Sequence, residues 1–108
     1  MFARILEFGV KIEKRAEFIK VLKNEVVPIL KKQVGFREIL PFFPDKVGDN
    51  VALNITLWTT KTDAERFQNE TYPRVYEIVK PFLTTPVTMR LVTLETTLSE
   101  HLVETFAA

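Results

Sequence analysis

The chain of 108 residues contains no cysteine, and this absence excludes several kinds of site. Without thiols there is no disulfide, no thiolate metal site and no cysteine nucleophile, and the composition fits a reducing compartment. Histidine is scarce too, because His101 is the only one. The sequence has no P-loop, GxGxxG, HExxH or GxSxG motif and no metal-spaced cluster of His, Asp and Glu. It therefore predicts no metal site, no nucleotide cofactor and no triad hydrolase.

A surplus of charge and a long apolar run are also missing. Fifteen Lys and Arg residues against fourteen Asp and Glu residues give a net charge of +1, so no strong field attracts nucleic acid. Residues 1–10 place Arg4 and Glu7 among apolar residues and lack a cleavage-site pattern, so we expect neither a signal peptide nor a membrane span. The expected location is the cytoplasm.

Hydrophobic residues make up 46% of the chain and charged residues 27%, as in ordinary globular proteins. No linker composition divides it, so we expect a single domain over residues 1–98. Residues 99–108 then form a C-terminal tail, and a capping-box candidate of Thr97 and Glu100 opens it. A helix this short is not stable alone, so we expect it to dock on the domain or on a partner.

The clearest strand pattern covers residues 50–60. Side chains in a strand alternate between its two faces. One face of this segment is apolar, with Val51, Leu53, Ile55 and Leu57, and the other is mixed and carries Asn54 and Trp58. The apolar face requires burial, and the mixed face is the best place in the chain for a ligand site. Periodicity alone does not say which face meets the helices.

Three more strands are expected at residues 2–11, 36–43 and 87–98. Pro41 has no backbone N–H, so its strand is expected at a sheet edge or a bulge. Helical periodicity covers residues 13–33, with an apolar stripe of Ala16, Ile19, Leu22, Val26 and Leu30.

Pro28 predicts a kink or a change of trajectory within this helix. A second helical region, in two pieces at residues 63–72 and 74–82, begins at a capping box of Thr62 and Glu65.

The resulting β-α-β-β-α-β order predicts a ferredoxin-like α+β fold, a four-stranded antiparallel sheet with both helices on one face. Two helices cover only one side of such a sheet. Each large apolar side chain that stays exposed on the other side lacks the roughly 1.5–3 kcal/mol of stabilisation that its burial would contribute. We therefore expect a homodimer that packs the two sheet faces together, because an isologous contact needs only one self-complementary surface.

The chain resembles the antibiotic biosynthesis monooxygenase domain in three features. These are the element order, the start of the second strand at Gly35 and Phe36, and the way Leu57, Trp58 and Thr59 lead into a capped helix. That family belongs to the dimeric α+β barrel superfamily. The resemblance implies a pocket between sheet and helices in each subunit, with Asn54 and Trp58 reaching into it. It also implies an oxidoreductase that needs no cofactor.

In the implied reaction, a small aromatic or quinol-type substrate is deprotonated and passes an electron to dioxygen. Asn54 and Trp58 are the catalytic candidates, since an amide and an indole N–H can stabilise an oxyanion. Tyr72, Tyr76, Glu7 and Arg90 are candidate substrate-binding residues that add a proton relay or a counter-charge. The haem-degrading branch of the family uses a histidine in or near the second helix, which this chain lacks.

Each candidate also has a purely structural explanation. Trp58 is large and apolar and can be a packing residue, and Asn54 can be satisfied by Thr56 and nearby backbone groups. Arg90 can pair with Glu7 across the sheet. The alternative function is therefore a non-catalytic, dimeric small-molecule binding or stress-associated protein on the same scaffold. A third class, a structural interaction module, predicts no internal cavity.

Overall fold

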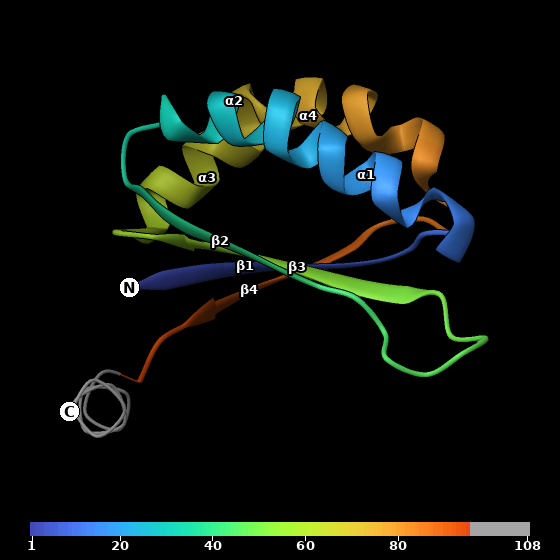
Figure 1. Ribbon diagram of the computed structural model, residues 1–108. Coiled ribbons are helices and arrows are strands. Elements are labelled where there is room, and N and C mark those ends of the chain that lie inside the picture. Colours follow the sequence, from blue (N-terminus) through green and yellow to red (C-terminus); the bar gives the residue numbers. More distant parts are fainter. Residues whose placement is uncertain (96–108) are drawn as a thin grey trace, which may run out of the picture.

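A computed structural model describes residues 1–95 as one four-stranded sheet with helices on one side (Figure 1). In chain order the elements are β1 (Phe2–Gly9), the 3-10 turn η1 (Ile12–Lys14), α1 (Arg15–Val21), the π-helical turn η2 (Leu22–Val26), α2 (Val27–Lys31), β2 (Phe36–Phe42), β3 (Val51–Trp58), α3 (Lys61–Glu70), α4 (Tyr72–Val79), the 3-10 turn η3 (Lys80–Phe82) and β4 (Thr88–Thr93). The predicted tail, with its capping box and His101, lies outside the described residues.

The sheet has the strand order β2-β3-β1-β4, and every neighbouring pair is antiparallel. Both helical regions cover the same face of it (Figure 1). This is the predicted ferredoxin-like α+β fold. The strand that contains Pro41 is an edge strand, as predicted, and a bulge lies between Phe36 and Glu38. Within residues 1–95, no helix is long and apolar enough to span a membrane.

The two faces of β3 have opposite environments. Ala52, Asn54, Thr56 and Trp58 are buried beneath the helices, while Val51 is exposed and Leu53, Ile55 and Leu57 are half-buried on the outer face. The sequence left open which face meets the helices, and the structure places the mixed face there, on the side that the family resemblance implied.

The first helical run buries a different stripe from the predicted one. Ala16 is exposed and Ile19 is 44% exposed, whereas Phe18 is buried together with Leu22, Val26 and Leu30. These four residues are spaced by four, which exceeds the roughly 3.6 residues of an α-helical turn. The π turn η2, in which the Val27 N–H donates to the Leu22 carbonyl, takes up the excess and keeps them on one face.

The irregularity expected at Pro28 takes the form of this π turn. Pro28 lies at the start of α2, directly after η2. A proline ring crowds the carbonyl four residues earlier in a regular α-helix, and the wider turn relieves that contact.

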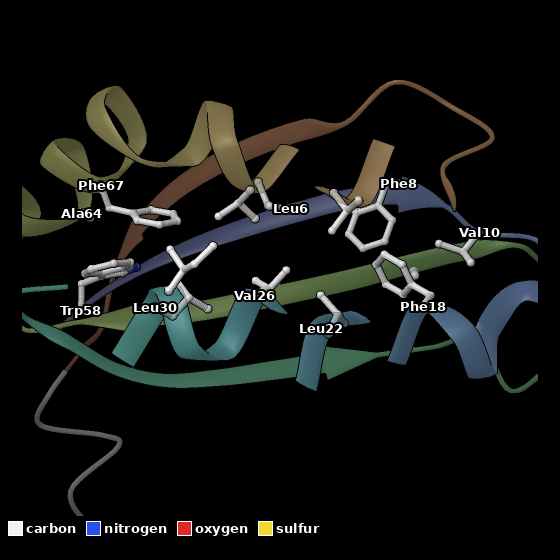
Figure 2. Packing of buried hydrophobic residues seen from close by; sticks show 14 of the residues in the cluster. Leu6, Phe8, Val10, Phe18, Leu22, Val26, Leu30, Trp58, Ala64 and Phe67 are labelled. Atoms are coloured by element: carbon white, nitrogen blue, oxygen red, sulfur yellow. The ribbon is translucent and has the colours of Figure 1, made fainter. Parts of the chain in front are cut away.

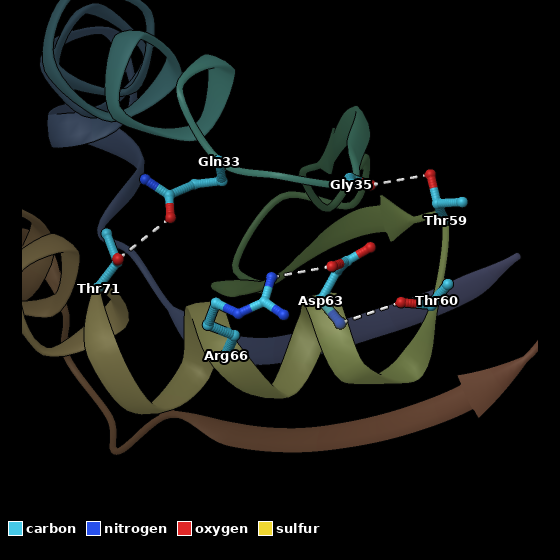
Figure 3. Close-up of polar contacts among 7 residues, drawn as sticks. All are labelled: Gln33, Gly35, Thr59, Thr60, Asp63, Arg66 and Thr71. Atoms are coloured by element: carbon cyan, nitrogen blue, oxygen red, sulfur yellow. Dashed lines mark hydrogen bonds and ion pairs between the residues drawn. The ribbon is translucent and has the colours of Figure 1, made fainter.

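The start of α3 corrects the predicted capping box. The helix begins at Lys61, and its cap is Thr60, whose hydroxyl oxygen accepts a 3.1 Å hydrogen bond from the Asp63 backbone N–H (Figure 3). Asp63 also accepts a 3.0 Å hydrogen bond from Arg66. Thr62 lies inside the first turn, so its predicted role as the cap was wrong. Both threonines precede an acidic residue by three positions, so the motif alone cannot distinguish them.

Two aromatic clusters mark the ends of the core. Phe18 packs on Phe8 at 5.7 Å between ring centroids, and Trp58 packs on Phe67 at 5.0 Å. Figure 2 shows these pairs at opposite ends, with Leu6 and Val26 between them. The middle of the core is therefore filled by smaller aliphatic side chains.

The outer face of the sheet is largely apolar, and no helix among residues 1–95 covers it. The cross-strand registers place these apolar side chains on it: Ala3, Ile5, Leu40, Phe42, Val51, Leu53, Ile55, Leu57 and Val92. Phe42 and Val51 are about half exposed. A continuous apolar surface of this kind is typical of an interaction site.

Candidate active site

A small cavity of about 30 Å³ lies between the sheet and the helices. Among the described residues that line it, only Asn54 and Tyr72 have polar side chains, and the rest of the lining is apolar. A second space of about 20 Å³ shares Asn54, Tyr72 and Leu6 with the first and is also lined by Arg4. Such volumes hold a few water molecules at most. An aromatic ligand therefore requires side chains to move.

Asn54 is the buried polar group at the centre of this region. Its side chain is on the helix-facing side of β3 and is 9% exposed, and it lines both spaces. Its Oδ1 atom has no hydrogen-bond partner. A buried amide oxygen without a partner costs about 1–3 kcal/mol. The structural explanation, in which Thr56 and backbone groups satisfy this amide, therefore does not account for its oxygen.

Arg4 is a buried residue that the sequence reasoning missed. It lies on β1 opposite Thr56 and is 1% exposed. Its guanidinium carbon lies 4.9 Å from the ring centres of both Phe67 and Tyr72. Its Nη2 donates hydrogen bonds to Gln68 Oε1 and, at 3.6 Å, to Met89 Sδ, while its Nε has no partner. Burial lowers the pKa of Arg4 from its ordinary value to about 10, against a smaller opposing effect of Tyr72.

The sequence did contain a signal for Arg4. Phe2, Leu6 and Phe8 have the same strand parity, and all three are buried beneath the helices. Arg4 lies between Phe2 and Leu6 in this alternation. Because side chains alternate between the two faces of a strand, Arg4 is expected on the same buried face as these residues.

Tyr72 lies at the point where the cavity meets the surface. It starts α4, is half-buried and lines both internal spaces. Burial raises the pKa of its phenol, the charge of Arg4 opposes this rise, and Tyr76 adds to it. The phenol is therefore held in its neutral, hydrogen-bonding form.

A surface groove of about 390 Å³ lies directly outside Tyr72. Its lining comprises Gln68, Tyr72, Tyr76, Pro86, Val87 and Met89. Tyr72 and Val87 also line the inner cavity, so these two side chains border both spaces. The groove is large enough for a small aromatic molecule.

Trp58 has a different environment from the one its predicted role requires. It is fully buried between Phe36 and Phe67, and its indole N–H donates a 3.0 Å hydrogen bond to Thr56 Oγ1. It does not line either internal space. In this conformation its N–H is already engaged, so its catalytic role stays a prediction.

Glu7 and Arg90 lie apart from the other candidates. The registers place both on the outer face of the sheet, where Glu7 is opposite Thr88 and Arg90 is opposite Ile5. Both are exposed, and no ion pair joins them in the part of the chain that is described. Within one chain they do not meet the cavity, and their predicted role in substrate binding remains untested. The described residues also contain no group of three or more His, Asp or Glu side chains able to hold a metal ion.

Comparison with known proteins gives a likeness in fold. No protein-family model matches the sequence, and no curated protein matches it. Among solved structures, the chain is similar to SnoaB, a cofactor-independent oxygenase from Streptomyces nogalater, solved as a mutant. The two share 19% identity with a TM-score of 0.68, over 87% of this chain and 92% of that one.

Two further structures are similar. A monooxygenase from Streptomyces coelicolor, in complex with nanaomycin D, has 13% identity and a TM-score of 0.69, over 87% of each chain. An antibiotic biosynthesis monooxygenase has 16% identity and a TM-score of 0.66, over 87% of this chain and 98% of that one. The predicted resemblance to this family is confirmed as a likeness in fold.

Proposed function

We propose that the protein is a cofactor-independent monooxygenase that oxidises a small aromatic or quinol-type substrate with dioxygen in the space beneath the helices. The observation that carries this proposal is the Asn54 amide, which is buried and faces an apolar cavity with its oxygen unpartnered. A polar group kept at such a cost is best explained by a ligand that completes its hydrogen bonding. The named activities of the similar oxygenases support the same reaction type.

The substrate itself supplies the electrons in this reaction. Its deprotonated form gives one electron to dioxygen, the resulting radical and superoxide combine to a peroxide anion, and this anion takes up the proton that the substrate had lost to become the hydroperoxide. Loss of water from the hydroperoxide leaves the quinone, so one oxygen atom enters the product and the other leaves as water. The protein has to bind the substrate in a dry site and hold donors at the developing oxyanion. The Asn54 amide N–H₂ is one such donor, because Asn54 lines the cavity. The Trp58 N–H would be a second donor if its hydrogen bond to Thr56 were broken.

Substrate entry requires movement at Tyr72 and Val87. The outer groove of about 390 Å³ can accept a substrate, whereas the inner cavity of about 30 Å³ cannot hold one in this conformation. These two side chains are common to both spaces, so their displacement merges them. Coupling of ligand binding to such local movement is common in enzymes that exclude water.

The proposal includes a cytoplasmic homodimer formed through the outer sheet face. The apolar surface of Leu53, Ile55 and Leu57 supports it, because a second copy buries the same surface on both chains. In such a dimer Glu7 and Arg90 would lie at or near the contact.

A non-catalytic small-molecule binding protein is the second candidate. The hydrogen bond from the Trp58 N–H to Thr56 favours it, because that bond removes one of the two predicted oxyanion donors. Binding without turnover needs only the groove and the cavity.

Oxygen uptake separates the two functions. Quinols and anthrone-like compounds are supplied to the wild type, to Asn54→Ala and to Trp58→Phe, which keeps an aromatic ring and removes the N–H. Asn69→Ala is the matched control, because Asn69 is exposed on α3. The proposal predicts uptake that falls at least tenfold in Asn54→Ala and is unchanged in Asn69→Ala, since one lost oxyanion donor costs roughly 10²–10³ in rate. Binding without uptake would favour the second candidate.

A further inference from the structure

Arg4 is a buried cation without an anionic partner among residues 1–95. Its side chain is 1% exposed, and no Asp or Glu of the described residues forms an ion pair with it. Its hydrogen-bond acceptors, Gln68 and Met89, are neutral. A buried charge is normally paired, because removal from water costs far more than neutral contacts return. The fold therefore maintains an unbalanced positive charge beneath the helices.

The contacts of Arg4 hold the guanidinium in a fixed position without neutralising it. Phe67 and Tyr72 lie at equal distances of 4.9 Å from its central carbon, so aromatic rings restrict its movement. Its Nε–H remains without an acceptor. A rigid, planar donor group with an unused N–H is suited to receive an oxyanion.

The position of Arg4 links the two spaces of the candidate site. Three of its contacts, Gln68, Tyr72 and Met89, line the outer groove, and Arg4 itself lines the inner space next to Asn54. A molecule in the groove therefore lies against side chains that contact the guanidinium directly.

We propose that Arg4 is the anion-binding residue of the site and selects acidic hydroxyaromatic or hydroxyquinone molecules, which bind as their oxyanions. This inference rests on the proposed function for the location of the ligand, but it does not require turnover. A fixed cation lowers the pKa of a bound phenol or enol, so the ligand loses its proton to solvent on entry without a protein base. The neutral Tyr72 phenol then serves as a second hydrogen-bond donor to the same oxygen.

A binding comparison of two quinones tests this role. Lawsone is a hydroxynaphthoquinone that is an anion at neutral pH, and unsubstituted para-naphthoquinone has the same rings without the acidic hydroxyl. Trp58 is the single tryptophan and packs on Phe67, which contacts Arg4, so quenching of its fluorescence reports binding. We expect wild type to bind lawsone at least tenfold more tightly than para-naphthoquinone.

Substitution of Arg4 tests whether the preference for lawsone depends on the charge of this residue. Arg4→Met keeps an unbranched side chain and removes the cation, and it should weaken lawsone binding about 10- to 100-fold, the range of a charged hydrogen bond, with para-naphthoquinone binding unchanged. Arg15→Met is the matched control, because Arg15 also stacks on a phenylalanine, Phe43, at 5.0 Å, but is outside the cavity lining. It should retain the preference.

Urea unfolding of the unliganded variant provides the second readout. If Arg4 is kept for a ligand, Arg4→Met unfolds at the same or a higher urea concentration, because replacing an unpaired buried charge by an apolar side chain removes a desolvation cost. A lower midpoint together with an unchanged lawsone preference would make Arg4 a structural residue and overturn the inference.

The remaining outcomes are equally decisive. Equal affinity of wild type for the two quinones, or no binding of either, overturns the anion site. Lawsone is already a quinone, so its binding does not depend on oxygenation. If lawsone is preferred in an Arg4-dependent way but no quinol causes oxygen uptake, the proposed activity is rejected and the anion site is retained. If oxygen uptake is seen without a preference for lawsone, the anion site is rejected and the proposed activity is retained.

Discussion

Three polar side chains, Arg4, Asn54 and Thr56, are buried beneath the helices, and each has a different hydrogen-bonding state. Thr56 accepts from Trp58, Arg4 is partly satisfied by neutral groups, and the Asn54 oxygen has no partner. Unsatisfied polar atoms are uncommon in folded proteins and cluster at functional positions. At the scale of residues, the candidate site is therefore marked by two buried polar atoms without a hydrogen-bond partner, Arg4 Nε and Asn54 Oδ1.

A spectroscopic pH titration of tyrosine tests the environment of Tyr72. Burial raises the pKa of this phenol, so tyrosinate absorbance should show one group that ionises later than a free tyrosine. Tyr72→Phe should remove that component, and Arg4→Met should move it to still higher pH, because the charge of Arg4 lowers the pKa of Tyr72. An unchanged Tyr72 component in Arg4→Met would show that the two groups do not interact.

The same pKa shift predicts the sign of a stability change. An acid whose pKa is higher in the folded state stabilises the fold fully below its unfolded pKa, here near 10.0, and this contribution is lost as the pH rises through the folded pKa. Tyr72→Phe should therefore lose less stability than wild type when urea unfolding is repeated with rising alkaline pH. A parallel loss in both proteins would contradict the shift.

The sequence located one of the two central site residues. Strict alternation in residues 50–60 placed Asn54 and Trp58 on one face, and the structure buries that face. It could not reveal that the Trp58 N–H pairs with Thr56, because a bond between side chains two positions apart depends on rotamers. Arg4 was missed because a charge in a strand is usually solvated, although its parity with Phe2 and Leu6 pointed inward.

At the scale of elements, the start of α3 gives a matched pair of substitutions. Thr60→Ala removes the cap that accepts from Asp63 and should lower the free energy of unfolding by about 1 kcal/mol. Thr62→Ala lies within the helix and should change it by less than about 0.5 kcal/mol, since alanine favours helix. Urea denaturation of both variants measures the difference, and equal effects would contradict the assigned cap.

Gly35 connects the first helical region to β2 and requires a left-handed backbone, with φ of +81°. A β-carbon at this position would collide with the Asp63 side chain, which is held by Arg66. Gly48 has φ of +90° with open space around it. Gly35→Ala should therefore destabilise the fold by more than Gly48→Ala, for which the backbone strain alone costs roughly 1 kcal/mol. Thermal unfolding that ranks the two variants in the opposite order would refute this.

Element types and order could be predicted because apolar periodicity and proline positions are local signals. Which face of the first helical region is buried could not be predicted. The π turn η2 changes which residues share a face, and a π turn has no clear sequence signature. This turn replaced the expected Ala16 and Ile19 by Phe18 in the buried stripe.

At the scale of the whole molecule, the sheet separates two surfaces of different character. The helix-facing side holds the cavity, and the outer side presents a continuous apolar surface centred on Ile55, which is opposite Ile5 and Leu40 in neighbouring strands. A surface of this type without cover favours association. The homodimer is the predicted consequence.

Ile55→Glu should convert the dimer to a monomer, because each copy would place a charge at the centre of the contact. Ile19→Glu is the control, since Ile19 is an exposed isoleucine of α1, and this helix lies on the other side of the sheet (Figure 1). Light scattering after size exclusion should give twice the chain mass for wild type and Ile19→Glu, and the chain mass for Ile55→Glu. A monomeric wild type at micromolar concentration would reject the dimer.

Isotopically labelled dioxygen provides the decisive test of a cofactor-free oxygenation in the space around Asn54. Purified protein without added cofactor is supplied with an anthrone-like substrate, and the product is analysed by mass spectrometry. We expect wild type and Asn69→Ala to form a quinone with one labelled oxygen atom, and Asn54→Ala to form it no faster than a sample without protein. An unlabelled product, or equal labelling rates with and without the Asn54 amide, would contradict the proposed oxygenation.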